Sequence, residues 1–208
     1  MTEILIEKNF SLNLDGDIFE EPGSAIISAI GHGVNLFGVM GGFASLVDRK
    51  FPDDAEQYRA VCPFDVDDMG RVSDADVDSV PDDKLRLGKA ILTGGSLESH
   101  LWVAHIASQV RPGSDARVMA LYNGVLDAAV KVGMGGELAI LRVPLIGGGI
   151  GGIDPVVAAH VIKSAAIAAD DTTNTSVMLY LRSEDPATAA VTNHFLPNGV
   201  DENFSSKL

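Results

Sequence analysis

The feature that most constrains the fold is a glycine-rich segment between a strongly apolar run and the start of a helix. Residues 138–146 are almost entirely apolar and include β-branched side chains, which predicts a buried strand. Asp154 and Pro155 follow, and an acid directly before a proline is typical of a helix that begins at the proline. Between them, the pattern Gly-x-Gly-x-x-Gly at 147–152 removes β-carbons that would keep a phosphate away from the backbone amides. The pattern favours the interpretation of this segment as a phosphate-binding loop, although the same pattern also occurs in tight turns without a ligand.

Predicted strands and helices alternate along the rest of the chain. Alternating or continuous apolar runs predict strands at 10–14, 24–30, 88–93, 101–107, 138–146 and 176–181. Helices are expected to start near residues 43, 155 and 186 and to span 115–132, where apolar residues recur at helical spacing. This order indicates an α/β fold with a largely parallel sheet that helices cover on both faces.

The chain reads as one domain, 1–208, because no proline-rich or low-complexity linker divides its 208 residues. One segment differs in character: between Pro52 and Lys84, aspartates dominate and apolar residues follow no regular period. We expect this acidic segment, at about 53–84, to be a surface insertion that is partly mobile. A C-terminal extension is expected after about residue 195.

Composition argues against several classes of function. The net charge of −14 would repel polynucleotides at long range, so we expect no binding of bulk nucleic acid. No apolar run reaches the roughly 18 residues of a membrane-spanning helix, and the first residues lack the basic start of a signal peptide. Cys62 is the only cysteine, and neither Cys-x-x-Cys nor His-x-x-x-His occurs. We therefore expect a cytoplasmic protein without a membrane segment, bound metal or cofactor.

A Rossmann dinucleotide site is one interpretation of the glycine pattern at 147–152. That fold places an acid for the ribose hydroxyls about 20 residues after the glycines, and Asp170 and Asp171 lie near that distance. However, that acid should end the next strand, which here ends at Arg182, and a long stretch of chain precedes the glycines. An NADP-binding oxidoreductase is therefore an alternative that the sequence fits less well.

A second glycine-rich loop lies upstream, at 31–44, again between a predicted strand and a predicted helix. Two such loops can clamp one diphosphate. With both loops considered, the sequence resembles the macro domain family, in the segments Gly16-Asp17-Ile18, Asn35, Gly41-Gly42-Phe43-Ala44 and Ile146-Gly147-Gly148-Gly149-Ile150. The loop sequences most resemble those of the branch with ADP-ribosyl-glutamate hydrolases, ADP-ribose phosphatases and phage-type macro domains.

The resemblance implies a three-layer α/β/α domain whose mixed, largely parallel sheet has about six strands and binds ADP-ribose at its carboxyl end. Asp17 would accept a hydrogen bond from the adenine amine, with Ile18 beside it, and Asn35 would bind the distal ribose. The remaining expected ligand-binding residues form two walls around the diphosphate: Gly41, Gly42 and Phe43 on one side, and Gly147, Gly148, Gly149, Ile150 and Gly151 on the other.

Catalysis is a separate question, because hydrolysis at the distal ribose needs a positioned water and a group that removes its proton. The resemblance gives Asn35 the orienting role. His32 is the nearest titratable candidate for a base, and its glycine neighbours predict an accessible side chain, although a structural histidine is the alternative. Gly94 and Gly151 stand near positions where some related hydrolases carry a lysine and an aspartate.

The sequence therefore predicts a protein that binds ADP-ribose or a close derivative. It would either remove ADP-ribose modifications or process ADP-ribose-1″-phosphate, or else act without catalysis as a reader or a protein that sequesters a nucleotide signal.

Overall fold

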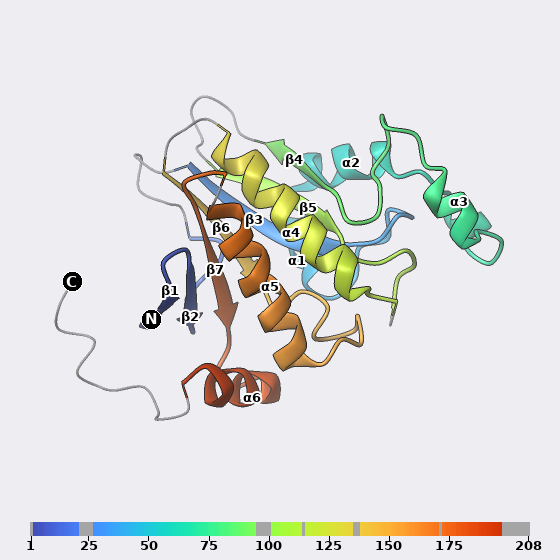
Figure 1. The fold of residues 1–208 in the computed structure, drawn as a ribbon. Coiled ribbons are helices and arrows are strands. Elements are labelled where there is room, and N and C mark those ends of the chain that lie inside the picture. Colours follow the sequence, from blue (N-terminus) through green and yellow to red (C-terminus); the bar gives the residue numbers. More distant parts are fainter. Residues whose placement is uncertain are drawn as a thin grey trace.

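The structure, a computed structural model, describes residues 2–20, 27–94, 101–113, 115–134, 138–170 and 172–196. Its strands are β1 (Thr2–Glu7), β2 (Phe10–Leu14), β3 (Ile27–Val34), β4 (Ala90–Gly94), β5 (Leu101–Ala107), β6 (Ala139–Pro144) and β7 (Thr175–Leu181). Its helices are α1 (Phe43–Lys50), α2 (Pro52–Val61), α3 (Asp74–Asp78), α4 (Val118–Gly133), α5 (Pro155–Asp170) and α6 (Pro186–Phe195), with a short 3-10 helix, η1, at Val66–Asp68. Figure 1 shows the helices arranged around a central sheet.

The strands form one mixed sheet in the order β1-β2-β7-β6-β3-β5-β4. The five strands between the edges run parallel, whereas β1 and β4 pair antiparallel with their neighbours. The mixed, largely parallel sheet predicted from the sequence is therefore confirmed. It has seven strands rather than about six, because β1 was not predicted. In β1, Ile4 and Ile6 pack against the core while Leu5 between them is exposed, which is the alternation of a half-buried strand.

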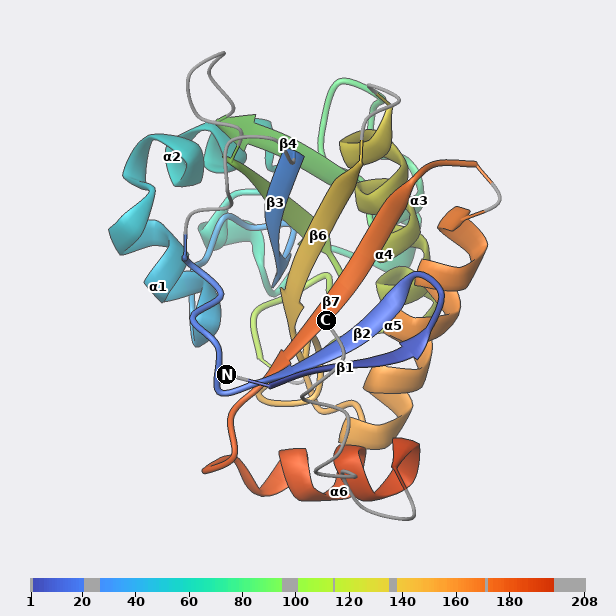
Figure 2. The ribbon, with the colours of Figure 1, turned by 90° about the vertical axis from the view of Figure 1, so that its left-hand side faces the viewer.

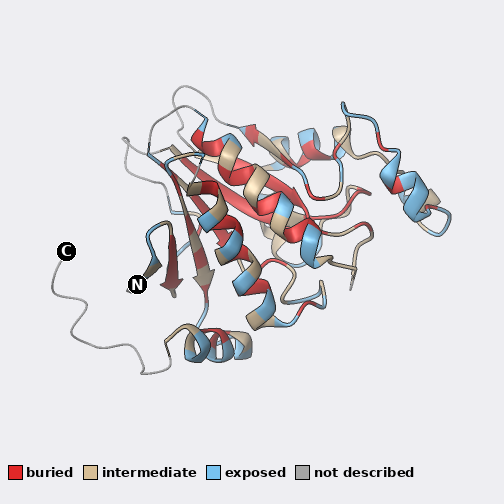
Figure 3. Cartoon of the chain, in the orientation of Figure 1, coloured by how far each residue is buried: buried red, intermediate tan, exposed pale blue. Residues whose placement is uncertain are grey.

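Helices cover both faces of the sheet. Figure 2 shows α4 and α5 on one side and α1 and α2 on the other, which gives the expected three layers. On the first side, α4 and α5 present small side chains to the strands, among them the fully buried Ala128, Ala129 and Ala158. Small residues let the helix axes approach the sheet closely. Larger side chains from the strands, such as Leu141 and Leu179, fill the space between the sheet and the helices. In Figure 3 the buried residues follow the sheet and the inward stripes of these helices.

The acidic segment at 53–84 contains regular structure and some buried side chains. It contains α2, η1 and α3, and it contributes to a second apolar cluster on the other face of the sheet. In α2, Ala55 and Tyr58 are fully buried, and three residues apart they lie on one face of the helix. A helix this short can be held by one turn of apolar contacts. Two buried residues are too few to produce a recognisable helical period in the sequence. The segment therefore combines many exposed acids with a few apolar side chains that reach the interior.

Two boundaries also differ from the sequence prediction. The strand expected at 24–30 is observed as β3, Ile27–Val34, and residues 24–26 lie outside the described residues. The strand thus continues through residues that were assigned to the following loop. The extension expected after about residue 195 follows α6, and from residue 197 onward it also lies outside the described residues. Among the described residues, no helix is long and apolar enough to cross a bilayer.

Candidate functional site

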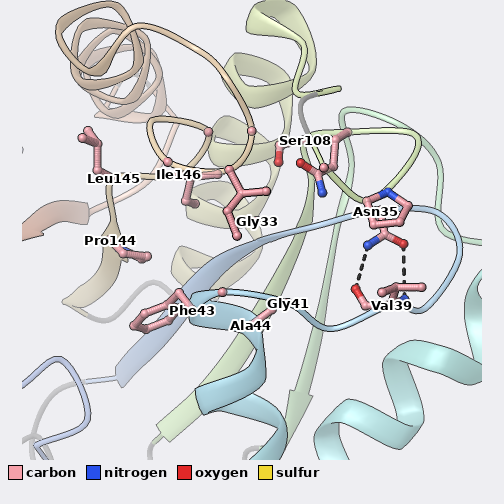
Figure 4. A pocket seen from close by; sticks show the side chains of 18 residues that line it. Gly33, Asn35, Val39, Gly41, Phe43, Ala44, Ser108, Pro144, Leu145 and Ile146 are labelled. Atoms are coloured by element: carbon pink, nitrogen blue, oxygen red, sulfur yellow. Dashed lines mark hydrogen bonds between the residues drawn. The ribbon is translucent and has the colours of Figure 1, made fainter. Parts of the chain in front are cut away.

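The candidate site lies where two neighbouring parallel strands end. β3 and β6 pair in parallel, so the loop that leads from β3 to α1 and the loop that leads from β6 to α5 leave the same edge of the sheet. We call them the first loop (35–42) and the second loop (145–154). Figure 4 shows residues of both loops around one pocket. The two glycine-rich segments that the sequence analysis singled out are therefore brought together.

Two adjoining pockets lie at this edge, and together we call them the cleft. The loop pocket, of about 180 Å³, lies between the first and second loops. The side pocket, of about 390 Å³, extends from there to the turn after β2 and the end of β7. The pockets share a wall made of Phe43, Pro144, Leu145 and Gly149. A long ligand could therefore occupy both pockets and cross this shared wall.

Glycines in both loops leave space inside the cleft and allow the two loops to approach each other closely. A β-carbon on Gly41 or Gly149 would meet no atom within 4 Å, so both positions face open space. Gly42 has a φ of 54°, and a β-carbon there would lie 3.3 Å from Cδ1 of Ile150 on the opposite loop. Gly147, with a φ of 82°, also adopts a backbone conformation that favours glycine. The two loops therefore approach each other closely at Gly42 and Ile150, above the loop pocket.

Backbone amides supply the polar groups of this narrow region. Within the part of the chain that the structure describes, the amides of Gly149, Ile150 and Gly151 donate no hydrogen bond to another residue. The start of α1 has no side-chain cap: the amides of Ala44 and Ser45 donate to the carbonyls of Gly41 and Gly42, at 3.1 and 3.2 Å, and those of Gly42 and Phe43 donate to no described residue. Unsatisfied amides at a helix start and in a glycine loop attract anions through their partial positive charge. Both walls of the cleft can therefore donate hydrogen bonds to a phosphate.

The start of α5 is different, because its own sequence caps it. The carboxylate of Asp154 accepts hydrogen bonds from the amides of Val156 and Val157, at 2.9 and 3.1 Å. This confirms Asp154 as the N-cap that the sequence predicted. The amides available to a ligand on this side are therefore those of the glycine loop and not those of the helix.

Asn35 holds the first loop in shape. Its side chain lines the loop pocket but is only 2% exposed. Its Nδ2 donates a hydrogen bond to the carbonyl of Val39 at 2.7 Å, and its Oδ1 accepts one from the amide of Val39 at 3.3 Å (Figure 4). Oδ1 also accepts a hydrogen bond from the amide of Phe37 at 2.9 Å. The carboxamide is thus largely used within the loop, and one amide proton remains for a ligand. The expected contact with a ribose stays a prediction.

Tyr58 of α2 supports the same loop from behind. It is fully buried, and its hydroxyl donates a hydrogen bond to the main-chain carbonyl of Asn35 at 2.6 Å. The ring of Tyr58 stacks on His105 with a centroid distance of 5.1 Å. The sequence analysis missed this role, because nothing in the local sequence of α2 indicates which buried group its tyrosine meets.

His32 does not occupy the cleft. It is fully buried on β3, and its Nε2 lies 2.9 Å from Nδ1 of His105, whose Nε2 in turn lies 2.9 Å from the hydroxyl of Thr93. Burial lowers the pKa of His32 to about 3, so the ring is uncharged at neutral pH. The expectation of an accessible base was wrong, because β3 extends to Val34 and carries His32 into the sheet. The interpretation of His105 as a core histidine is confirmed.

Asp17 lies at the far end of the cleft, in the turn after β2. Its side chain is exposed and lines the side pocket, while Ile18 next to it is 7% exposed and also lines it. One carboxylate oxygen, Oδ1, accepts a hydrogen bond from the amide of Phe19 at 2.9 Å, which leaves the other oxygen for a ligand. The ring of Phe19 stacks on Phe43 at 5.5 Å, so this turn is fixed against the start of α1.

Several lining residues were not predicted from the sequence. They share a position just beyond the carboxyl ends of other parallel strands: Ser108, Gln109 and Pro112 after β5, and Tyr180, Leu181 and Arg182 at the end of β7. A strand end is the signal that could have found them, because ligands of parallel sheets bind at that edge.

The loop pocket differs from the side pocket in its charge. The described residues that line the loop pocket are glycines, apolar residues, Asn35, Ser108 and Gln109, and none of them has an ionisable side chain. Asp17, Tyr180, Arg182 and Asp185 line the side pocket. No group of three or more histidine, cysteine or acidic side chains is arranged for a metal ion among the described residues. The loop pocket therefore offers hydrogen bonds but no protein side chain that can exchange a proton near neutral pH.

The fold is that of the macrodomains, as comparison with solved structures shows. The chain is similar to Thermosipho africanus DarTG in complex with ADP-ribose, with a TM-score of 0.64 and 22% identity, covering 95% of this chain and about half, 48%, of that one. It is also similar to the macrodomain of Thermus aquaticus DarG, with a TM-score of 0.58 and 20% identity over 83% of this chain and 99% of that chain. For a variant of the Oceanobacillus iheyensis macrodomain with ADPR, the TM-score is 0.60 and the identity 15%, over 92% of this chain and 95% of that one. No protein-family model and no curated protein sequence matches the chain.

The macrodomain fold overturns the Rossmann alternative. A Rossmann fold has the strand order 3-2-1-4-5-6 and places its glycine fingerprint after the first strand. Here the pattern at 147–152 follows the sixth strand, and both edge strands are antiparallel. The glycine pattern therefore belongs to the second wall of a two-loop cleft.

Replacement of Tyr58 by phenylalanine tests how the first loop is held. The stacked ring would remain, but the buried carbonyl of Asn35 would lose its donor, which costs about 1–3 kcal/mol. We expect a lower free energy of unfolding and faster hydrogen exchange at the amides of Phe37 and Val39. Urea unfolding and exchange mass spectrometry measure both, with Tyr122→Phe on α4 as the control. Equal exchange in the two variants would contradict the supporting role of Tyr58.

Proposed function

We propose that the protein binds ADP-ribose in the cleft and acts as a non-catalytic reader or as a protein that sequesters this nucleotide. The observation that carries the proposal is the pair of facing loops, because their free amides offer donors from both sides to a diphosphate. The similarity to macrodomain structures with ADP-ribose supports the same ligand.

The proposed pose assigns each part of ADP-ribose to one part of the cleft. Adenine would occupy the side pocket, where the free oxygen of Asp17 can accept a hydrogen bond from the exocyclic amine and Ile18 offers an apolar surface. The diphosphate would cross at Gly149, which lines both pockets. The distal ribose would enter the loop pocket beside Asn35. The order of the ligand's parts thus follows the order of the pockets.

The absence of an ionisable lining in the loop pocket favours binding over hydrolysis. A water that attacks the distal ribose must lose a proton, and general bases that accept it contribute roughly 100- to 10,000-fold to such rates. Within the described structure, the loop pocket presents only uncharged side chains, and His32 is buried elsewhere. We therefore propose a reader rather than a hydrolase of ADP-ribose modifications or of ADP-ribose-1″-phosphate.

Isothermal titration calorimetry tests the proposed ligand. ADP-ribose should bind one per chain, and AMP should bind at least tenfold more weakly because it lacks the part that spans the glycine loops. NADP should also bind more weakly, because its nicotinamide has to fit with the ribose in the loop pocket of about 180 Å³. Absence of ADP-ribose binding at millimolar ligand would refute the proposal, as would a clear preference for NADP.

A valine at position 149 tests the proposed path of the diphosphate. The new side chain would project into the open cleft without a clash in the free protein, because a β-carbon at Gly149 meets nothing within 4 Å. We expect ADP-ribose affinity to fall by at least tenfold in Gly149→Val while the melting temperature stays close to that of the unmodified protein. Gly70→Val is the matched control, since Gly70 is equally open and lines neither pocket. Unchanged affinity in Gly149→Val would show that the diphosphate does not cross here.

A turnover assay separates the reader from an enzyme. The protein should retain ADP-ribose affinity but release no ADP-ribose from a mono-ADP-ribosylated protein and no phosphate from ADP-ribose-1″-phosphate. Chromatography of the nucleotide products measures both reactions. Multiple turnovers of either substrate, abolished together with ADP-ribose binding in Gly149→Val, would establish catalysis and contradict the reader.

A further inference from the structure

Two histidines from different helices meet on the surface, at a place the cleft does not use. His160 of α5 and His194 of α6 are both exposed, and their Nε2 atoms lie 2.5 Å apart. The ring centroids are 4.6 Å apart and the ring planes cross at 78°. Figure 1 shows α6 next to one end of α5, so the pair lies at the contact between these helices. Each imidazole therefore directs the same ring nitrogen to one point from a separate helix.

The packing of α6 fixes the pair. Phe195, next to His194, lies 4.9 Å from the ring of His160 and 6.0 Å from the ring of Phe10 in the core. On the other side of Phe195, the ammonium of Lys163 lies 5.6 Å from the ring centroid and pairs with Glu7 at 2.9 Å. Both histidines thus stand on helices that apolar contacts hold in place.

The pKa of His160 is lowered, first by partial desolvation and then by the charges of His194 and Lys163. The charged side chain near the pair is Lys163 on α5, which forms an ion pair with Glu7 of β1. Uncharged imidazoles have a ring nitrogen with a lone pair, which is the form that binds a metal ion.

We propose that His160 and His194 form a binding site for a divalent transition-metal ion that prefers nitrogen ligands, such as Zn²⁺, Ni²⁺ or Cu²⁺. Such ions bind imidazole nitrogen at roughly 2.0–2.1 Å, which places two ligand nitrogens of a tetrahedral site roughly 3.3 Å apart. The two nitrogens lie 2.5 Å apart in the structure, so the exposed rings would have to turn slightly away from each other to bind one ion. Mg²⁺ and Ca²⁺ are unsuited, because they select oxygen ligands.

The ion would join α5 to α6 and keep open coordination positions. The described residues contain no third histidine, cysteine or acid in reach of this point, so water would complete the coordination. Metal ligands at short spacing are what a sequence pattern can indicate, whereas these two histidines are 34 residues apart. Only the packing of α6 on α5 brings them together.

Titration of the full chain with ZnCl₂ and with NiCl₂ tests the site by calorimetry, after removal of metal with a chelator. We expect one ion per chain, a higher melting temperature with Zn²⁺, and affinity at least tenfold lower in His160→Gln and in His194→Gln. Lys163→Gln is the directional control: loss of its positive charge should leave the affinity unchanged or raise it. Affinity should fall when the pH decreases from about 7.5 to 5.5, because protons compete for the same nitrogens.

A measurement on the unmodified protein makes the test independent of the variants. Electron paramagnetic resonance of the protein with one equivalent of Cu²⁺ should show coupling to two imidazole nitrogens. Equal affinity in both histidine variants, one ion per two chains, or a Cu²⁺ spectrum without imidazole coupling would each overturn the proposal. None of these results depends on ADP-ribose, so the metal site and the proposed function can fail separately.

Discussion

The parallel pairing of β3 with β6 is the constraint on which the candidate site depends. Residues 27–30 of β3 pair with residues 139–142 of β6, and both strands therefore end at the same edge of the sheet. The loops that follow must face each other because their strands are neighbours. Had another strand separated β3 from β6, the two glycine-rich segments would lie roughly 10 Å apart at their bases, twice the spacing of adjacent strands. The cleft is thus a consequence of strand order.

The same geometry would allow an acidic protein to bind an anion, as the proposed function requires. The net charge of −14 creates a repulsive field, but that field is screened over about 10 Å in salt. Amide groups in direct contact with a ligand act within hydrogen-bond distance, where screening is small. The loop pocket adds no charged side chain of either sign in the described structure, so the proposed selectivity would rest on the shape of two backbones. Asn35 and Tyr58 matter here because they keep one of those backbones in place.

The sequence predicted the fold class and both loops, because glycines between a strand and a helix leave a strong local signal. It also predicted the cap of α5, where Asp154 accepts hydrogen bonds from the first turn, and the start of α6 near residue 186. His32 was misassigned because the end of a strand has no sharp signal, and a shift of four residues moved the side chain from a loop into the core. Tyr58 and the histidine pair could not be predicted, since each depends on which helix packs against which neighbour. Residues near one another in the sequence were therefore assigned more reliably than residues that only the tertiary structure brings together.

A crystal structure of the ADP-ribose complex tests the central claim, that the two loops form one binding cleft. We expect diphosphate oxygens within hydrogen-bond distance of the second-loop amides and of the start of α1. We also expect the adenine beside Asp17 and the distal ribose beside Asn35. A ligand bound outside this edge of the sheet, or one with its adenine in the loop pocket, would contradict this claim.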